Sequence, residues 1–83
     1  MDNRTEAFLK KLNGKRIALC GIGRSNLPLI SLFKKYGAEI TACDRRSEDQ
    51  LGELAQQAKD AGAKLSLGDT YLSDLDVDIV FKN

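Results

Sequence analysis

The sequence predicts an α/β domain of the Rossmann-like type, a three-layer arrangement built around a mainly parallel sheet. Short apolar runs typical of buried strands alternate along the chain with stretches of helical periodicity. A glycine turn directly follows the first of these runs, as it does in nucleotide-binding βαβ units. The length of 83 residues suits one domain and not two.

The first half of the chain predicts a helix, a strand and a second helix. The first helix spans Asn3–Leu12, where apolar side chains recur along one stripe, and the following Asn-Gly pair ends it. Arg16–Cys20 reads as a strand buried on both faces. The second helix is Leu27–Tyr36, and Pro28 is tolerated in its first turn because the amides there lack helical partners in any case.

The next unit is a strand over Glu39–Cys43, with Asp44 standing at its end. Ser47 and Gln50 have the spacing of a capping box, which predicts the start of a third helix. Leucine and alanine recur at helical spacing after this box, so we expect one continuous helix that ends at Gly62.

Two short strands complete the pattern, over Lys64–Leu67 and over the β-branched stretch Asp76–Phe81. Right-handed crossovers give the four-stranded order 3-2-1-4, with the helices after strands one and two on the same face. We expect the N-terminal helix and the short link 68–75 to lie on the opposite face. The fold is expected to be truncated after strand four, whose open edge predicts self-association of this piece.

Composition limits the classes of function. The chain is 42% hydrophobic and 30% charged with a net charge of +1, so it carries no basic footprint for nucleic acid. It has no apolar run of the ~20 residues that span a membrane, and its polar start is unlike a signal peptide, so we expect a cytoplasmic protein. Without histidine there is no Ser-His or Cys-His nucleophile pair, and Cys20 and Cys43 are expected to be small buried side chains.

The candidate site is the glycine turn. Gly21 and Gly23 occupy the first two glycine positions of the G-x-G-x-x-G fingerprint, and Asn26 occupies the third. Ser25 is placed to cap the next helix, whose free amides would bind a phosphate. Asp44 lies at about the distance along the chain, ~20 residues, at which an acidic residue contacts a ribose or a base.

These residues leave two kinds of ligand open. One is a sugar nucleotide. The other is NAD(P) in a dehydrogenase or a regulatory module, where Asp44 would bond the ribose hydroxyls or Arg45 and Arg46 would hold a 2′-phosphate. A third alternative is a domain that folds but binds nothing well alone.

From Gly14 to Phe81 the sequence resembles the N-terminal domain of the UDP-N-acetylmuramoyl-L-alanine:D-glutamate ligases, a branch of the Mur ligase family. The resemblance rests on GKRIALCGIGRSNLPLISLFKKYGAEITACDRRSEDQLGELA and LGDTYLSDLDVDIVF. It includes Ser-Asn-x-Pro-Leu after the glycine turn and Asp-x-Arg at the end of the second strand.

This resemblance implies that residues 1–83 form the UDP-binding domain of a longer, multidomain ligase. The turn residues would meet the diphosphate, and the residues after strand two would meet the uracil. The implied UDP-binding residues are Gly21, Gly23, Arg24, Ser25, Asp44, Arg45 and Arg46. The resemblance implies no catalytic residue and no metal ligand in this domain.

The resemblance also implies what the parent enzyme does. It would add D-glutamate to UDP-N-acetylmuramoyl-L-alanine with ATP and Mg²⁺, in peptidoglycan biosynthesis and hence in cell shape and division. The sequence has no G-x-x-x-x-G-K-[ST] motif for ATP. We therefore expect this domain to bind substrate, to carry no cofactor of its own and to depend on the other ligase domains for catalysis.

Overall fold

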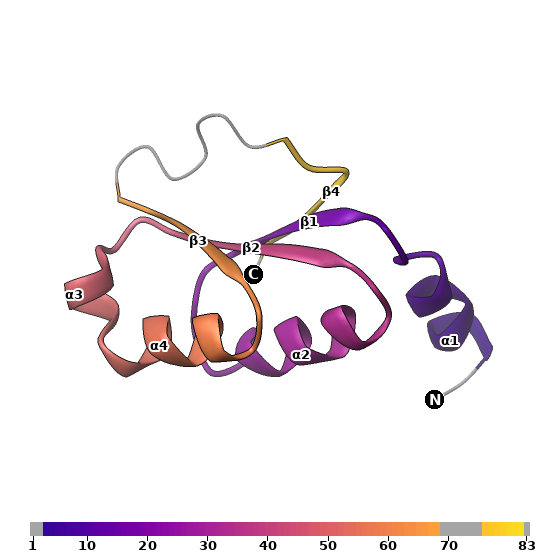
Figure 1. Cartoon of the computed structure of the whole chain (residues 1–83), viewed down its shortest axis with the longest axis horizontal. Coiled ribbons are helices and arrows are strands. Elements are labelled where there is room, and N and C mark those ends of the chain that lie inside the picture. The colour runs from indigo at the N-terminus through magenta and orange to yellow at the C-terminus, as the bar shows by residue number, and fades with distance from the viewer. Residues whose placement is uncertain (1–2, 69–75, 83) are drawn as a thin grey trace.

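The computed structural model describes residues 3–68 and 76–82, and Figure 1 shows helices lying against one face of a sheet. The elements are α1 (Asn3–Lys10), β1 (Arg16–Cys20), α2 (Leu27–Lys35), β2 (Glu39–Asp44), α3 (Glu48–Leu51), α4 (Glu53–Asp60), β3 (Lys64–Leu67) and β4 (Ile79–Lys82). Their order confirms the predicted α/β class.

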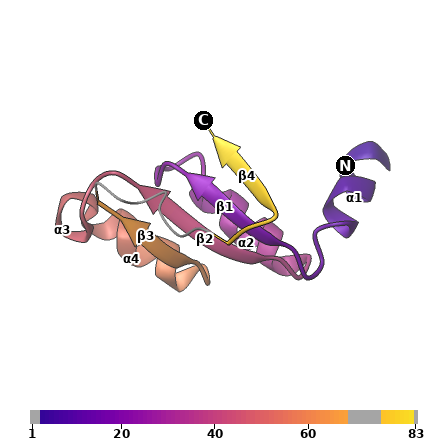
Figure 2. The same ribbon diagram turned by 90° about the horizontal axis from the view of Figure 1, so that it is seen from above.

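The four strands form one parallel sheet in the order β3-β2-β1-β4, as predicted (Figure 2). Ile17 of β1 pairs with Ile40 of β2 on one side and with Ile79 of β4 on the other. The strand order reverses between β1 and β4, and open α/β folds bind ligands beyond the carboxyl ends of the strands at such a point, so the turn that follows β1 lies there.

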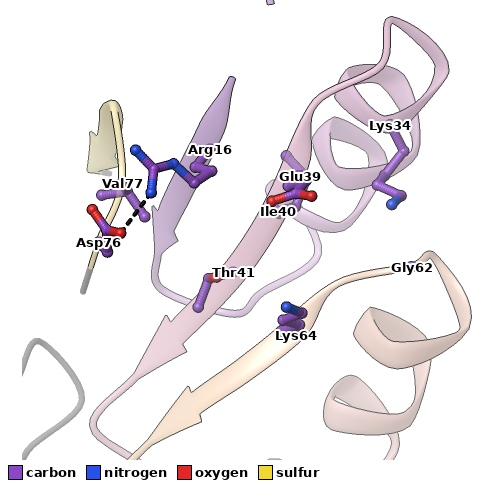
Figure 3. Close-up of a pocket in the computed structure, with 9 residues that line it drawn as sticks. All are labelled: Arg16, Lys34, Glu39, Ile40, Thr41, Gly62, Lys64, Asp76 and Val77. Carbon is purple, nitrogen blue, oxygen red and sulfur yellow. Dashed lines mark hydrogen bonds and ion pairs between the residues drawn. The ribbon is translucent and has the colours of Figure 1, made fainter. Parts of the chain in front are cut away.

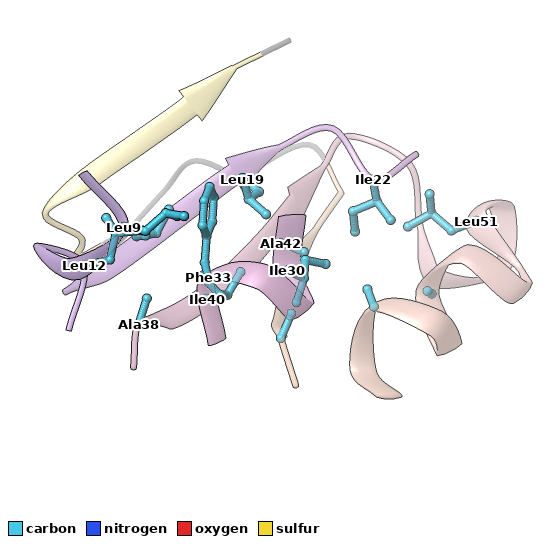
Figure 4. Packing of buried hydrophobic residues seen from close by; sticks show 14 residues of the cluster. Leu9, Leu12, Leu19, Ile22, Ile30, Phe33, Ala38, Ile40, Ala42 and Leu51 are labelled. Carbon is cyan, nitrogen blue, oxygen red and sulfur yellow. The ribbon is translucent and has the colours of Figure 1, made fainter. Parts of the chain in front are cut away.

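The core lies between the sheet and α2. Side chains at alternate strand positions point to the helices, so Ile17 and Leu19 share one apolar cluster with Ile30 and Phe33 of α2. Figure 4 shows Leu19 of β1 on the same side of the sheet as Ile30 and Phe33. All four are at most 3% exposed. Full burial of such a side chain contributes about 1.5–3 kcal/mol each, which fixes both the register of β1 and the position of the turn that follows it.

The N-terminal helix lies on the same face as α2, so the prediction that it covers the opposite face is wrong. The ring of Phe81 on β4 lies 6.2 Å from Phe8 of α1 and 5.2 Å from Phe33 of α2, measured between ring centroids. Leu9 and Leu12 are buried in the same cluster. The physical reason is the apolar surface on the α2 side, where Phe81 packs against the cluster that includes Leu9 and Leu12.

The predicted third helix is two helices. The capping box of Ser47 and Gln50 is present and opens α3, but the chain breaks at Gly52, which has φ +59° and ψ −125°. This left-handed backbone, which glycine adopts readily, ends α3 and lets α4 begin in a new direction. The predicted helix end at Gly62 fits its φ of +101°.

The fourth strand is shorter than predicted. It begins at Ile79 instead of Asp76, because the carboxylates of Asp76 and Asp78 bind Arg16 at the start of β1. The predicted link 68–75 lies outside the described residues after Gly68. Over residues 3–68 and 76–82, no helix combines the length and the apolar character needed to span a membrane.

Candidate functional site

The glycine turn and the end of β2 are held together by backbone contacts. Cys20 and Cys43 are paired at the carboxyl ends of β1 and β2, and the next amide, that of Gly21, donates to the Cys43 carbonyl oxygen at 2.7 Å. Gly21 has φ +100°, a conformation that costs a residue with a Cβ about 1–2 kcal/mol. The turn therefore begins at a glycine that its backbone requires.

The carboxylate of Asp44 joins the turn to the segment after β2. Its Oδ2 accepts the amide of Ile22 at 2.8 Å, and its Oδ1 accepts the amide of Arg46 at 2.8 Å. The Arg46 guanidinium bonds both oxygens, at 3.0 Å and 2.9 Å, and also donates to the Ile22 carbonyl oxygen at 2.9 Å. We call Ile22, Asp44 and Arg46 the carboxylate clamp.

The clamp keeps Asp44 ionised. Its side chain is only 8% exposed, and burial alone would raise the carboxyl pKa. The hydrogen bond from the Arg46 side chain outweighs burial, and the amides of Ile22 and Arg46 add to it, so the pKa of Asp44 lies well below its usual range. The same pairing raises the pKa of Arg46, whose side chain is 49% exposed.

The amides that follow Ile22 have no hydrogen-bond acceptor in the described part of the chain. Among the described residues, the N–H groups of Gly23, Arg24 and Ser25 make no hydrogen bond, and these residues directly precede α2. Arg24 and Ser25 are exposed and Gly23 is partly exposed. A Cβ added to Gly23 would meet nothing within 4 Å, and its φ is not in the left-handed region, so the fold itself does not require a glycine there.

Asn26, not Ser25, is the N-cap of α2, which corrects the predicted cap. Asn26 makes no capping hydrogen bond with its side chain. It is 6% exposed, and its Nδ2 donates to the Gly21 carbonyl oxygen at 2.6 Å. The residue at the third glycine position of the fingerprint thus supports the turn from behind, and the hydroxyl of Ser25 is not used as a cap.

Known proteins resemble this chain along most of its length. No protein-family model matches the chain. It is 49% identical over 76 residues to "UDP-N-acetylmuramoylalanine--D-glutamate ligase" of Clostridium novyi (strain NT), covering 90% of this chain and 17% of that protein. It is 42% identical over 83 residues to the ligase of the same name from Clostridium kluyveri (strain ATCC 8527), covering 99% of this chain and 18% of that protein.

The chain is a homologue of one segment of these D-glutamate ligases. It spans less than a fifth of the length of the ligases that it matches. The resemblance read from the sequence is therefore confirmed over nearly the whole chain.

The structure brings some predicted site residues of this ligase segment together and leaves others at the surface. Gly21, Asp44 and Arg46 meet around Ile22, a residue that sequence reasoning did not select. No pattern in the sequence marks Ile22, because it contributes backbone atoms. Arg45 is exposed, and its amide has no acceptor in the described part of the chain.

A cavity of about 230 Å³ lies elsewhere in the ligase segment (Figure 3). It is lined mainly by residues at the amino ends of the strands, among them Arg16, Glu39, Lys64 and Asp76. Arg16 is occupied there by Asp76, whose Oδ2 lies 2.6 Å from Nη1. None of the predicted UDP-binding residues lines this cavity, and parallel α/β sheets bind ligands at the opposite ends of their strands, so the candidate site is the glycine turn.

Proposed function

We propose that this chain binds the UDP end of UDP-N-acetylmuramoylalanine as part of a D-glutamate ligase. The observation that carries the proposal is the row of three amides, at Gly23, Arg24 and Ser25, that have no acceptor among the described residues. The names of the relatives support it, because each is a ligase of UDP-N-acetylmuramoylalanine and D-glutamate.

The diphosphate would lie against these amides. N–H groups at the start of a helix carry partial positive charge, and α2 begins at Leu27, immediately beyond the turn. A side chain at Gly23 would stand between the backbone and a phosphate oxygen. Its open surroundings explain why a glycine that the fold does not need is useful to a ligand.

The uracil would lie beside the carboxylate clamp. A carboxylate has about four lone-pair sites, and the clamp already directs four N–H groups at Asp44. A ring N–H can therefore reach Asp44 only if one guanidinium contact of Arg46 is released, and the half-exposed guanidinium can exchange it for water. The Arg45 amide, which has no acceptor among residues 3–68 and 76–82, would be a further donor for the ring.

The activity of the whole ligase is proposed on the same relatives. We propose an ATP-dependent, Mg²⁺-requiring enzyme of the cytoplasm that adds D-glutamate in peptidoglycan synthesis. Within it, this segment would bind substrate, and the other domains would supply ATP and D-glutamate. NAD(P) binding is the competing function. Arg46 is less available to a 2′-phosphate than the sequence suggested, because Asp44 holds its guanidinium.

Gly23→Ala tests the proposal. The unfolding temperature should stay close to wild type, because the added methyl group meets nothing. The amide shifts that UDP produces at Gly23–Ser25 and at Asp44–Arg46 should weaken, because the methyl group separates the backbone from phosphate. NADPH serves as the control ligand. If NADPH shifts these amides and UDP does not, the ligase proposal is wrong. If wild type and Gly23→Ala bind UDP equally well, the diphosphate does not bind at the turn.

A further inference from the structure

Two cysteines stand side by side at the edge of the candidate site. Cys20 ends β1, Cys43 lies next to last in β2, and the two are register partners in the parallel ladder. Paired residues on neighbouring strands point to the same face, and their strands lie about 4.7–4.9 Å apart. This spacing falls within the Cα separation of disulfides, about 4.4–6.8 Å. Both cysteines are free thiols.

The two thiols differ in access. Cys43 is 0% exposed, whereas Cys20 is partly exposed. Burial raises the pKa of Cys43 to about 11, and the neighbouring Cys20 thiol adds to the shift. Cys43 therefore stays protonated near neutral pH and out of reach of solutes, and the thiol that a dissolved oxidant can reach is that of Cys20.

We propose that Cys20 and Cys43 are a redox pair that closes to an intrachain disulfide when a peroxide oxidises Cys20. The peroxide transfers one oxygen to the Cys20 sulfur, which gives a sulfenic acid and water. The Cys43 sulfur then attacks the Cys20 sulfur. The S–S bond forms, the S–O bond breaks, and hydroxide leaves with the Cys43 proton as a second water. The two thiols lose two electrons, which reduce the peroxide.

Closure acts directly on the candidate site. Cys20 precedes Gly21 and Cys43 precedes Asp44, so each sulfur is one residue from the backbone that shapes the turn. A disulfide needs its Cβ atoms about 3.8 Å apart, closer than the strand spacing, so closure draws the strand ends together. Because Cys20 is partly exposed, cellular thiols can reach the disulfide and reduce it, which makes the change reversible. We also expect closure to weaken UDP binding, and this expectation rests on the proposed function.

The test is mass spectrometry of the reduced chain exposed to one equivalent of hydrogen peroxide. We expect the loss of two hydrogens, about 2 Da, with both free thiols lost together, no covalent dimer, and full recovery in dithiothreitol. Cys20→Ser should show no such loss, and because Cys20 is partly exposed this variant should fold. Sulfinic acid at Cys20 beside a free Cys43 thiol, or an interchain disulfide, would overturn the redox pair.

A second readout needs no ligand and so separates this inference from the proposed function. On oxidation, the amide signals of Gly21, Ile22 and Asp44 should shift and return on reduction, while those of Ala55 in α4 stay fixed. Unmoved signals at the turn in a chain that has formed the disulfide would overturn the effect on the site. Failure of UDP to bind the reduced chain would instead contradict the proposed function and leave these two measurements valid.

Discussion

Asp44→Asn is the most informative single substitution in this chain. It keeps the shape of the side chain but replaces one oxygen with an NH₂ group. Donors reach both oxygens of Asp44, from the Ile22 amide on Oδ2 and from the Arg46 amide on Oδ1. Either orientation of the new amide therefore puts N–H against N–H, and at least one backbone donor loses its acceptor.

The size of the effect follows from burial. Asp44 is 7% exposed and Ile22 is 2% exposed, so water does not readily replace the lost contact. A hydrogen bond to a charged group contributes about 1.5–3 kcal/mol. A domain of this length has a free energy of unfolding of roughly 4–12 kcal/mol, and each kcal/mol shifts the unfolding temperature by about 4–8 °C. We expect Asp44→Asn to unfold at least about 6 °C below wild type.

The assay is thermal unfolding of both chains at several pH values. The folded-state pKa of Asp44 lies below its ordinary value, so its stabilising effect is present above the unfolded pKa of about 4 and is lost as the pH falls toward the folded value. The difference in unfolding temperature between wild type and Asp44→Asn should therefore become smaller as the pH falls from 6 to about 3. Asp60→Asn is the matched control, because Asp60 is exposed and bonds only Gln56 in the described structure.

Two results would refute this reasoning. Equal unfolding temperatures for Asp44→Asn and Asp60→Asn would show that the clamp does not stabilise the fold. A gap between wild type and Asp44→Asn that stays constant from neutral to acid pH would show that the charge of Asp44 is not the cause.

Three further predictions concern the scaffold. Ile17→Ala, at a side chain that is 0% exposed, should lower the free energy of unfolding in urea by about 2–5 kcal/mol, whereas Val80→Ala, at 50% exposure, should change it little. Gly37→Ala should lower the free energy of unfolding by about 1–2 kcal/mol, because Gly37 has φ +88° and a Cβ there would collide with Asn13. Adding Asn13→Ala to this variant should remove the collision but not the cost of the backbone conformation. In the described structure β4 pairs only with β1, so its other edge is open to pairing with a second chain. Sedimentation should therefore show self-association at millimolar concentration, and a chain that stays monomeric at that concentration would contradict this prediction.

The sheet could be predicted because its evidence is local and its assembly is constrained. Apolar runs such as Ile17–Cys20 mark strands, and right-handed crossovers allow few orders for them. The place of α1 could not be predicted in the same way. Its apolar stripe, including Leu9 and Leu12, shows that one side is buried but not against which face. The break at Gly52 was missed because leucine and alanine keep helical spacing across it.

The candidate site was predictable in position but not in its contacts. A glycine turn after one strand and Asp44 after the next must meet when the strands are parallel neighbours. The clamp depends on the backbone of Ile22, which has no signature in the sequence. Likewise, serine is a common helix cap, so Ser25 was the natural choice, whereas Asn26 is selected by its tertiary contact with Gly21.

The clamp also decides how binding data on this ligase segment must be read. Under the proposed function, a weaker affinity of Asp44→Asn for UDP would have two causes: the loss of the proposed acceptor for the uracil and the displacement of the turn, because Asp44 holds the Ile22 amide. A weaker affinity of Gly23→Ala would have one cause, the contact with the ligand, since the added methyl group touches nothing in the free chain. Only a loss of binding in Gly23→Ala at unchanged stability therefore locates the diphosphate. If both variants lose affinity and only Asp44→Asn loses stability, the turn binds the ligand and the clamp positions the turn.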